Sequence, residues 1–150
     1  MDKNKYPLSG FYFNVKFTPS VDDAVSGFKE VSGLEVKIKT KPVTQAGDTV
    51  PRYLPKGSPL YKNLVLKRGF FINSGFNDWC FDTFHNFNIK LRDIDIELLS
   101  IQNDSKTISA AWHVIDAYPV SWNLSSFNAQ KNDVVIESVE LVYSHFVRSK

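Results

Sequence analysis

The stretch DAYPVSWNLSSFNAQKNDVVIESVELVY, residues 116–143, decides the fold of this chain. Its first part is typical of a strand that bends or ends at Pro119, because proline removes a hydrogen-bond donor from the ladder. Ser125 to Asp133 is rich in Ser, Asn, Asp and Gln, which favour turns. From Val134 onward β-branched and apolar residues predominate, without Gly or Pro. The stretch therefore predicts two strands joined by a polar connection.

Two segments nearer the N-terminus, residues 11–17 and 34–40, show the alternation of a half-buried antiparallel strand. The predicted inward faces are Phe11, Phe13, Val15 and Phe17 in the first segment and Leu34, Val36 and Ile38 in the second. Charged and polar side chains stand between them and should face outward. The loop-forming residues 18–27 separate the two segments.

Further strands are predicted downstream. Residues 89–101 read as a strand whose apolar side chains change face, which predicts a bulge near Arg92 and Asp93. Residues 107–118 should pair back with it as a hairpin, and residues 60–68 add another strand. The sequence thus predicts a mainly β protein, with about seven strands around one helix.

One amphipathic helix is predicted from Gly75 to Asn86. Its apolar stripe at helical spacing is Phe76, Trp79, Cys80, Thr83, Phe84 and Phe87. Asn73 or Ser74 can cap its start, and Asp78 near the first turn suits the helix dipole.

Residues 41–59 are unlike the rest of the chain. They hold four prolines and two glycines, yet they also contain Val43, Val50, Tyr53 and Leu54. The segment is longer than an ordinary connection, and such segments are often functional. It predicts an extended hairpin arm or an ordered loop.

Length and composition bound the class of protein. A chain of 150 residues, 43% hydrophobic and 23% charged, is expected to form a single globular domain over residues 1–150. A net charge of +2 argues against wrapping nucleic acid by bulk electrostatics, and one cysteine excludes an internal disulfide. The N-terminus lacks a signal-peptide core, and no run approaches the roughly 20 apolar residues of a membrane span. We therefore expect synthesis in the cytoplasm and no membrane anchor.

No residue pattern indicates catalysis. His85, His113 and His145 lack metal-ligand spacing, so we expect neither a metal nor a catalytic role for them. Cys80 lies on the apolar stripe and is expected to be a buried small hydrophobe rather than a nucleophile. The glycines form neither a phosphate-binding loop nor a dinucleotide fingerprint. The sequence predicts no catalytic, cofactor-binding or metal site, and hence a protein that is not an enzyme.

Three sets of side chains each leave two interpretations open. The sets are the carboxylates Asp93, Asp95 and Glu97, the basic residues Lys62, Lys67 and Arg68, and the tryptophans Trp79, Trp112 and Trp122. The carboxylates could bind a divalent ion, but a solvated or partner-facing surface is commoner. The basic set could touch phosphate, although pairing with an acidic strand fits the low net charge better. The tryptophans could line a ligand cavity, but aromatic side chains mostly supply core area in small β domains.

The opening stretch resembles the tail-tube proteins of contractile phages and phage-derived injection particles. That family carries an Ala-x-Pro-x-x-Trp turn, an Asn-Ala-x-x-Asn loop and an Ile-Glu-x-x-Glu-Leu strand. The matching positions here are Ala117, Pro119, Trp122, Asn128, Ala129, Asn132, Ile136, Glu137, Glu140 and Leu141. Residues 28–34 (FKEVSGL), residues 61–69 (YKNLVLKRG) and the pair Asp78-Trp79 are similar to further family segments in the same order. The chain departs from the pattern at Ala46-Gly47, where Gly-Gly is usual, and at Ser121, where lysine is frequent.

The resemblance implies a small antiparallel β-barrel or sandwich with one flanking helix, similar to type VI secretion tube subunits. It implies that six subunits form a ring and that rings stack into the hollow inner tube of a contractile tail or injection particle. The implied partners are other copies of the chain, the sheath protein, baseplate and terminator proteins, and an effector or DNA in the lumen. The implied location is an assembled, virion-like particle, extracellular or anchored to a cell.

The predicted strand edges and the arm fit this implication, because exposed edges pair with neighbours and head-to-tail contacts can close into rings. We expect the arm to contact other subunits through Thr44, Val50, Arg52, Tyr53 and Leu54. A tube-initiator or adaptor ring at a baseplate would use the same fold. The alternative from another class is a monomeric β-barrel that binds a small ligand and elutes at 17.1 kDa.

Overall fold

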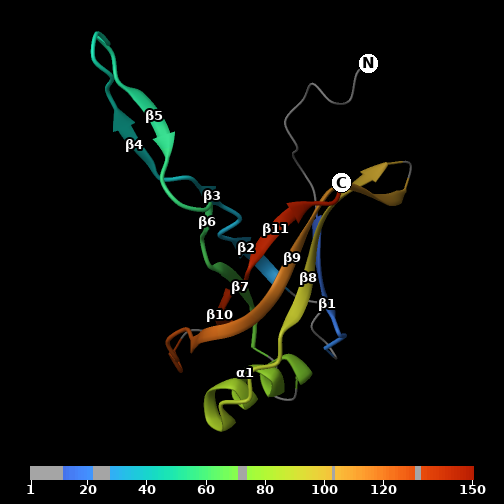
Figure 1. Ribbon diagram of the computed structural model, residues 1–150. Coiled ribbons are helices and arrows are strands. Elements are labelled where there is room, and N and C mark those ends of the chain that lie inside the picture. Colours follow the sequence, from blue (N-terminus) through green and yellow to red (C-terminus); the bar gives the residue numbers. More distant parts are fainter. Residues whose placement is uncertain (1–11, 22–27, 71–73, 103, 131–132) are drawn as a thin grey trace.

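The computed structural model describes residues 12–21, 28–70, 74–102, 104–130 and 133–150 (Figure 1). In this part of the chain the elements are β1 (Tyr12–Thr18), β2 (Phe28–Ser32), β3 (Val36–Lys37), β4 (Thr40–Val43), β5 (Arg52–Pro55), β6 (Leu60–Tyr61), β7 (Leu64–Gly69), α1 (Gly75–Asn86), β8 (Arg92–Gln102), β9 (Ser105–Leu124), β10 (Ile136–Val142) and β11 (His145–Arg148). Three positions named above, Phe11, Asn73 and Asn132, lie outside the described residues.

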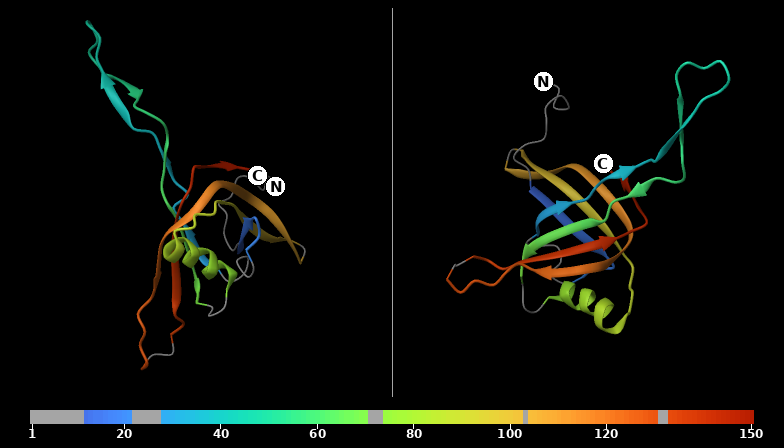
Figure 2. Two further views of the ribbon diagram at one scale, coloured as in Figure 1. Left: turned by 60° about the horizontal axis from the view of Figure 1, so that its bottom comes forward. Right: turned by 90° about the vertical axis from the view of Figure 1, so that its left-hand side faces the viewer.

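The main sheet is antiparallel, and the long strand β9 joins its two halves (Figure 1). Its order is β1-β8-β9-β10-β7-β2, and β11 also pairs with β9. The first part of β9 pairs with β8 and β11, whereas its last part pairs with β10. Because β9 bends between these partners, the two halves face each other across a shared core, with α1 at one end (Figure 2). This confirms the mainly β, antiparallel fold with one flanking helix.

The core draws on both halves of the sheet and on the helix. Its buried apolar side chains include Val15, Phe17, Leu64, Leu66, Phe76, Trp79, Cys80, Ile94, Ile96, Val114, Ala117, Val139 and Leu141. Trp112 and Trp122 are partly buried and pack against this cluster. The three tryptophans therefore serve the core, as the second interpretation predicted.

Pro119 bends β9 but does not end it. The strand continues to Leu124, and its register with β10 shifts so that Leu141 lies opposite Pro119 while Glu140 lies opposite Ser121. The residue between them, Val120, is therefore the extra residue of a bulge. A bulge tolerates the missing N–H of proline, so the strand crosses from one half of the sheet to the other.

The bulge predicted in β8 is present, because the register with β9 shifts between Arg92 and Ile94. The predicted start of this strand at Ile89 was wrong. β8 begins at Arg92, and Ile89 and Leu91 precede it with 42% and 49% exposure. The change of face in the sequence pattern therefore arises because Ile89 and Leu91 lie before the strand begins.

The inward orientation predicted for Val36 and Ile38 was also wrong. These side chains are 49% and 52% exposed, and only Leu34 of that set packs against the core. The reason is that β3 pairs with β6 in a two-stranded ribbon that is separate from the main sheet and leaves the body. Alternation alone cannot distinguish such a ribbon from a half-buried strand.

The helix has the predicted bounds, and Ser74 is its N-cap, accepting hydrogen bonds from the backbone N–H groups of Phe76 and Asn77. Cys80 is fully buried as expected, and burial raises the pKa of its thiol. Phe84 and Phe87 were predicted on the buried stripe, but they are 39% and 82% exposed. Phe87 is the C-cap in the left-handed conformation, so the helical spacing no longer applies to it.

Two of the three residues of the basic set, Lys67 and Arg68, pair with acidic residues of neighbouring strands. Arg68 forms a buried ion pair with Glu137 of β10, and Lys67 lies 3.5 Å from Glu30 of β2. Lys62 is exposed where the ribbon joins the body. No helix among the described residues is long and apolar enough to cross a membrane.

Candidate assembly surfaces

A two-stranded ribbon, residues 35–62, projects from the body and is called the arm below (Figure 2). Near the body β3 pairs with β6, and further out β4 pairs with β5. The backbone N–H of Lys56 also donates to the carbonyl of Lys39 at 2.7 Å, which bridges the two pairs. The predicted hairpin arm is therefore present, and it begins closer to the body than residue 41.

The tip of the arm is a closed turn. The backbone N–H of Asp48 donates to the carbonyl of Gln45 at 3.0 Å, and the Asp48 carboxylate accepts from the N–H of Gln45 at 3.3 Å. Gly47 has a φ of 93°, a conformation that favours glycine. Ala46 thus stands where the family often has a second glycine, while the position that needs glycine keeps it.

The residues predicted to make inter-subunit contacts all lie exposed on the arm. They are Thr44, Val50, Arg52, Tyr53 and Leu54. Val50 is 70% and Tyr53 67% exposed, although both are large apolar side chains. Exposed apolar side chains gathered on one projecting element are typical of a contact surface.

An aromatic cluster at the root of the arm holds it to the body. The Tyr61 ring meets Phe146 edge-on at 5.2 Å between ring centroids and Tyr143 at 6.0 Å. The Tyr143 hydroxyl donates to the Lys62 carbonyl at 2.6 Å, and burial with the nearby Tyr61 raises its pKa to about 12. Sequence reasoning missed this cluster, although two aromatic residues close together at the C-terminal end are a usable signal.

Close backbone packing also fixes the root of the arm. Gly33 has a φ of 98°, and a Cβ added there would lie 2.1 Å from the carbonyl oxygen of Asn63. Only glycine fits this approach. The Ser-Gly-Leu motif therefore sets the point at which the chain leaves β2 for the arm.

The main sheet presents two strands at the ends of its order, β1 and β2. Within the described residues each has a single partner, β8 for β1 and β7 for β2. In this part of the chain, the outer side of each strand therefore has backbone groups without a strand partner. The open edges argue against a closed ligand-binding barrel.

The carboxylates Asp93, Asp95 and Glu97 project from one face of β8 and are engaged by basic side chains. His113 Nδ1 lies 2.7 Å from Asp95 and its Nε2 lies 3.3 Å from Asp93, while Lys16 contacts Glu97 at 3.0 Å. Among the described residues no group of three potential ligands could hold a metal ion. The arrangement is a partly exposed charged surface, which is the commoner of the two interpretations.

We expect His113 to stabilise the fold in a pH-dependent way. Its hydrogen bond to Asp95 and the charges of Asp95 and Asp93 raise its pKa above 6.5, against a smaller effect of desolvation. A raised folded-state pKa gives stability that is fully present below the unfolded value and is lost as pH rises through the folded value. Urea unfolding of wild type and His113→Gln should differ most below about pH 6 and converge in alkaline solution. If wild type and His113→Gln differed in unfolding free energy by the same amount at acid and alkaline pH, this role would be refuted. In an Asp95→Asn background, the effect of His113→Gln at acid pH should be smaller.

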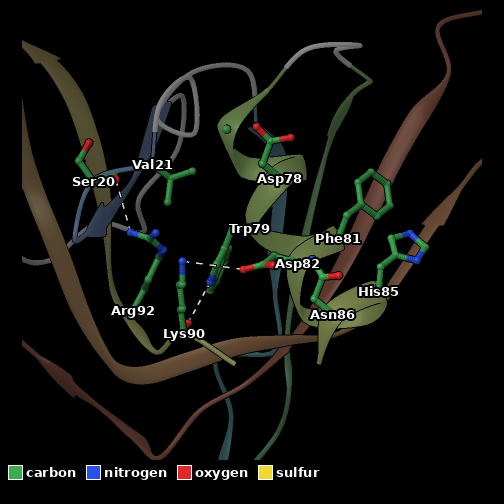
Figure 3. A pocket seen from close by; sticks show the side chains of 11 residues that line it. Ser20, Val21, Asp78, Trp79, Phe81, Asp82, His85, Asn86, Lys90 and Arg92 are labelled. Atoms are coloured by element: carbon green, nitrogen blue, oxygen red, sulfur yellow. Dashed lines mark hydrogen bonds and ion pairs between the residues drawn. The ribbon is translucent and has the colours of Figure 1, made fainter. Parts of the chain in front are cut away.

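A pocket of about 570 Å³ lies beside α1 and the start of β8 (Figure 3). Acidic and basic side chains share its lining, including Asp78, Asp82, Lys90 and Arg92. Arg92 donates to the carbonyl of Pro19, and its guanidinium lies 5.6 Å from the Trp79 ring centroid. The pocket is thus a hollow beside the helix whose lining combines charged side chains with Val21 and Trp79 of the core.

The sequence and the fold both match known tube proteins. Residues 9–147 match the family described as T4-like virus tail tube protein gp19. Comparison with curated protein sequences gives no match.

Three solved structures contain chains that are similar to this one. A chain of the PVC sheath-tube complex, an extracellular contractile injection system in the extended state, is 25% identical with a TM-score of 0.76, over 97% of this chain and 93% of that one. A chain of the anti-feeding prophage baseplate is 21% identical with a TM-score of 0.81, over 96% of each chain. A type six secretion system protein is 10% identical with a TM-score of 0.55, over 91% of this chain and 83% of that one, which shows a shared fold alone.

The antiparallel sheet, the flanking helix and the family match over residues 9–147 lead to one conclusion. This chain belongs to the T4-like virus tail tube protein gp19 family and is a tube subunit of a contractile tail or injection system.

Proposed function

We propose that six copies of this chain form a ring and that the rings stack into the hollow inner tube of a contractile particle. The proposal rests on one observation: a single small body has two open sheet edges, β1 and β2, and also carries an exposed arm (Figures 1 and 2). In this proposal residues 1–150 act as one tube domain. The role is mechanical, without enzymatic chemistry, because the tube is a conduit that the sheath drives forward.

The sheet edges supply the contacts within a ring. β1 and β2 stand at opposite ends of the strand order, so the β1 edge of one subunit can meet the β2 edge of the next. Such a contact is head-to-tail, and it closes into a ring when the rotation between neighbours divides a full turn. Closing the ring satisfies the backbone groups that a lone subunit leaves exposed.

The arm supplies the contact between rings. It extends beyond the body and carries Thr44, Val50, Arg52, Tyr53 and Leu54 on its exposed outer part. The aromatic cluster at its root keeps it directed away from the body. An ordered arm loses less conformational entropy on contact than a free loop, which favours binding.

The proposed partners follow from the position in the particle. The sheath surrounds the tube, the baseplate meets its first ring, and a terminator closes its last ring. The lumen would carry an effector protein or DNA. The length of the assembly distinguishes an adaptor from a main tube subunit. An adaptor protein would form single rings, whereas a main tube subunit would form long tubes.

Deleting Thr44 to Tyr53 should abolish stacking while leaving the body folded. Wild-type protein is expected to form tubes under negative-stain electron microscopy, and the deletion variant is expected to form rings or subunits only. Apart from the partly buried Pro51, the deleted residues are exposed, and none contributes a side chain to the core, so circular dichroism and melting should remain close to wild type. Long tubes from the deletion variant would show that the arm is not the stacking element. Wild-type protein that stays a 17.1 kDa monomer at high concentration would refute the tube itself.

A further inference from the structure

The arm is strongly basic, although the chain as a whole is nearly neutral. Residues 35–62 hold six Lys or Arg and two Asp or Glu, a net +4, while the whole chain carries +2, so the remainder carries −2. The basic residues, all exposed, are Lys37, Lys39, Lys41, Arg52, Lys56 and Lys62. None of the ion pairs between described residues involves these six side chains. A surface with this excess of positive charge favours an acidic partner.

The end of the body opposite the arm carries acidic side chains. Helix α1 lies at this end in Figure 1 and again in the right-hand view of Figure 2. Asp78 is exposed in its first turn, and Asp82 follows one turn later with its side chain 29% exposed. Both face the hollow beside the helix in Figure 3. The hydrogen bond from Asn86, followed by Asn88 and the charge of Lys90, holds the pKa of Asp82 below its ordinary value, so Asp82 stays charged.

The neighbouring strand ends add to this negative charge. Asp93, Asp95 and Asp116 lie where β8 begins and β9 passes beside it, and the Asp93 carboxylate accepts from the N–H of Asp116 at 3.0 Å. The basic residues of this end are already occupied. Lys90 lies 3.8 Å from Asp82, and Arg92 donates to the carbonyls of the β1 end. His113 contacts both Asp93 and Asp95, so five aspartates share the α1 end with Lys90, Arg92 and His113, and acidic side chains remain in excess.

We propose that the arm of one subunit docks, through its basic side chains, on the acidic α1 end of a second copy in the next ring. The inference rests on the proposed stacking role of the arm and names its acceptor. When identical rings stack in one orientation, an element that protrudes from one end of a subunit reaches the opposite end of a subunit in the next ring. In this chain those two ends carry opposite charge.

The charge arrangement also favours one relative orientation of stacked rings. In a head-to-head stack two basic arms would meet, and in a tail-to-tail stack two acidic helix ends would meet. Both arrangements place like charges together, which penalises the wrong orientation. Complementary charges speed the correct encounter, and the effect weakens as salt shortens the screening length.

Charge reversal and its compensation test the inference. The arm variant is Lys39→Glu with Lys41→Glu, the acceptor variant is Asp78→Lys with Asp82→Lys, and a third protein combines all four changes. Lys106→Glu with Lys150→Glu is the matched control, because it changes the net charge by the same amount as the arm variant, on exposed residues outside the arm and outside strands β1 and β2. Tube content is measured by sedimentation and negative stain in low salt, after circular dichroism has verified folding. If the acceptor variant does not fold, Asp78→Lys alone replaces it.

We expect each single-sided variant to lower the tube fraction by about tenfold, and the combined protein to recover most of it. The matched control should stay close to wild type, and wild-type stacking should weaken with added salt. Failure of the combined protein to recover would overturn α1 as the acceptor. An arm variant that stacks like wild type, while the arm deletion abolishes tubes, would refute the charge contact and leave the stacking role intact. If, in addition, wild-type rings retard a short DNA duplex, the basic surface serves nucleic acid instead.

Discussion

Glu137→Gln is expected to destabilise the fold by about 3–5 kcal/mol, because it removes the negative charge that faces a buried arginine. Arg68 Nε donates to Glu137 Oε2 at 3.1 Å, and both side chains are fully buried. The other carboxylate oxygen accepts from Trp122 Nε1 at 2.7 Å. The substituted amide would keep the shape of the side chain but lose the charge and one of the two hydrogen-bond acceptors, so the loss should report the polar contacts rather than packing.

The same arginine ties the helix to the sheet. Arg68 Nη2 donates to Ser74 Oγ at 2.6 Å, and Ser74 is the N-cap of α1. The guanidinium also lies 4.9 Å from the Phe76 ring centroid and 5.2 Å from that of Phe28. Weakening the ion pair should therefore loosen the start of the helix as well as the pairing of β7 with β10.

Urea denaturation at one fixed protein concentration measures this effect, since assembly would add stability. Glu140→Gln on the same strand is the matched control. Its side chain is half-buried and accepts a hydrogen bond from Asn63, a role that glutamine can keep, so it should cost less than about 1 kcal/mol. Replacing the pair together, Arg68→Met with Glu137→Leu, should cost less than Glu137→Gln alone, because no lone charge stays buried. Equal stability of Glu137→Gln and wild type would contradict the buried pair.

Trp79→Ala should cost about 3–5 kcal/mol, because it empties a packed site between the helix and the sheet. Trp79 is 4% exposed and meets Phe17 at 5.7 Å and Phe76 at 5.9 Å between ring centroids. Its ring N–H donates to the Lys90 carbonyl at 2.9 Å, so the substitution also frees the segment that leads into β8. The melting temperature should fall by roughly 10 °C.

Phe84→Ala is the matched control for Trp79→Ala. It lies on the same helix and was predicted on the same stripe, but it is 39% exposed. We expect it to change stability by less than about 1 kcal/mol. Full thermal stability of Trp79→Ala, or an equal loss from Phe84→Ala, would contradict the helix face seen here.

For the helix, the sequence pattern predicted the bounds and the cap but not the exposure of every apolar side chain. Its bounds and its cap followed from spacing and from Ser74, because those signals are local. The exposure of Phe84 and Phe87 did not follow, because it depends on where the sheet lies beneath the helix and on the left-handed turn that ends it. The ion pair of Arg68 was expected only as pairing with an acidic strand, since burial depends on partners 69 residues apart.

The arm also has features that the sequence predicted and features that only the structure shows. The prolines, glycines and length of residues 41–59 predicted an arm. The five predicted contact residues all lie exposed on it. The arm is longer than predicted, because Val36 and Ile38 alternate like a half-buried strand although both side chains are exposed on the ribbon. The aromatic root of the arm joins residues more than 80 positions apart, so no local pattern pointed to Tyr61 and Phe146 as a pair.

The sequence by itself determined the antiparallel β class, the helix, the arm and the membership of a tube family, because periodicity, turn residues and ordered motifs are written along the chain. Only the tertiary structure decided that β9 passes through Pro119 to join two half-sheets, that Arg68 and Glu137 are buried together, and that a basic arm lies opposite an acidic helix end. These features depend on which distant segments meet, and that is set by the summed burial and pairing of the whole chain rather than by any one stretch of it.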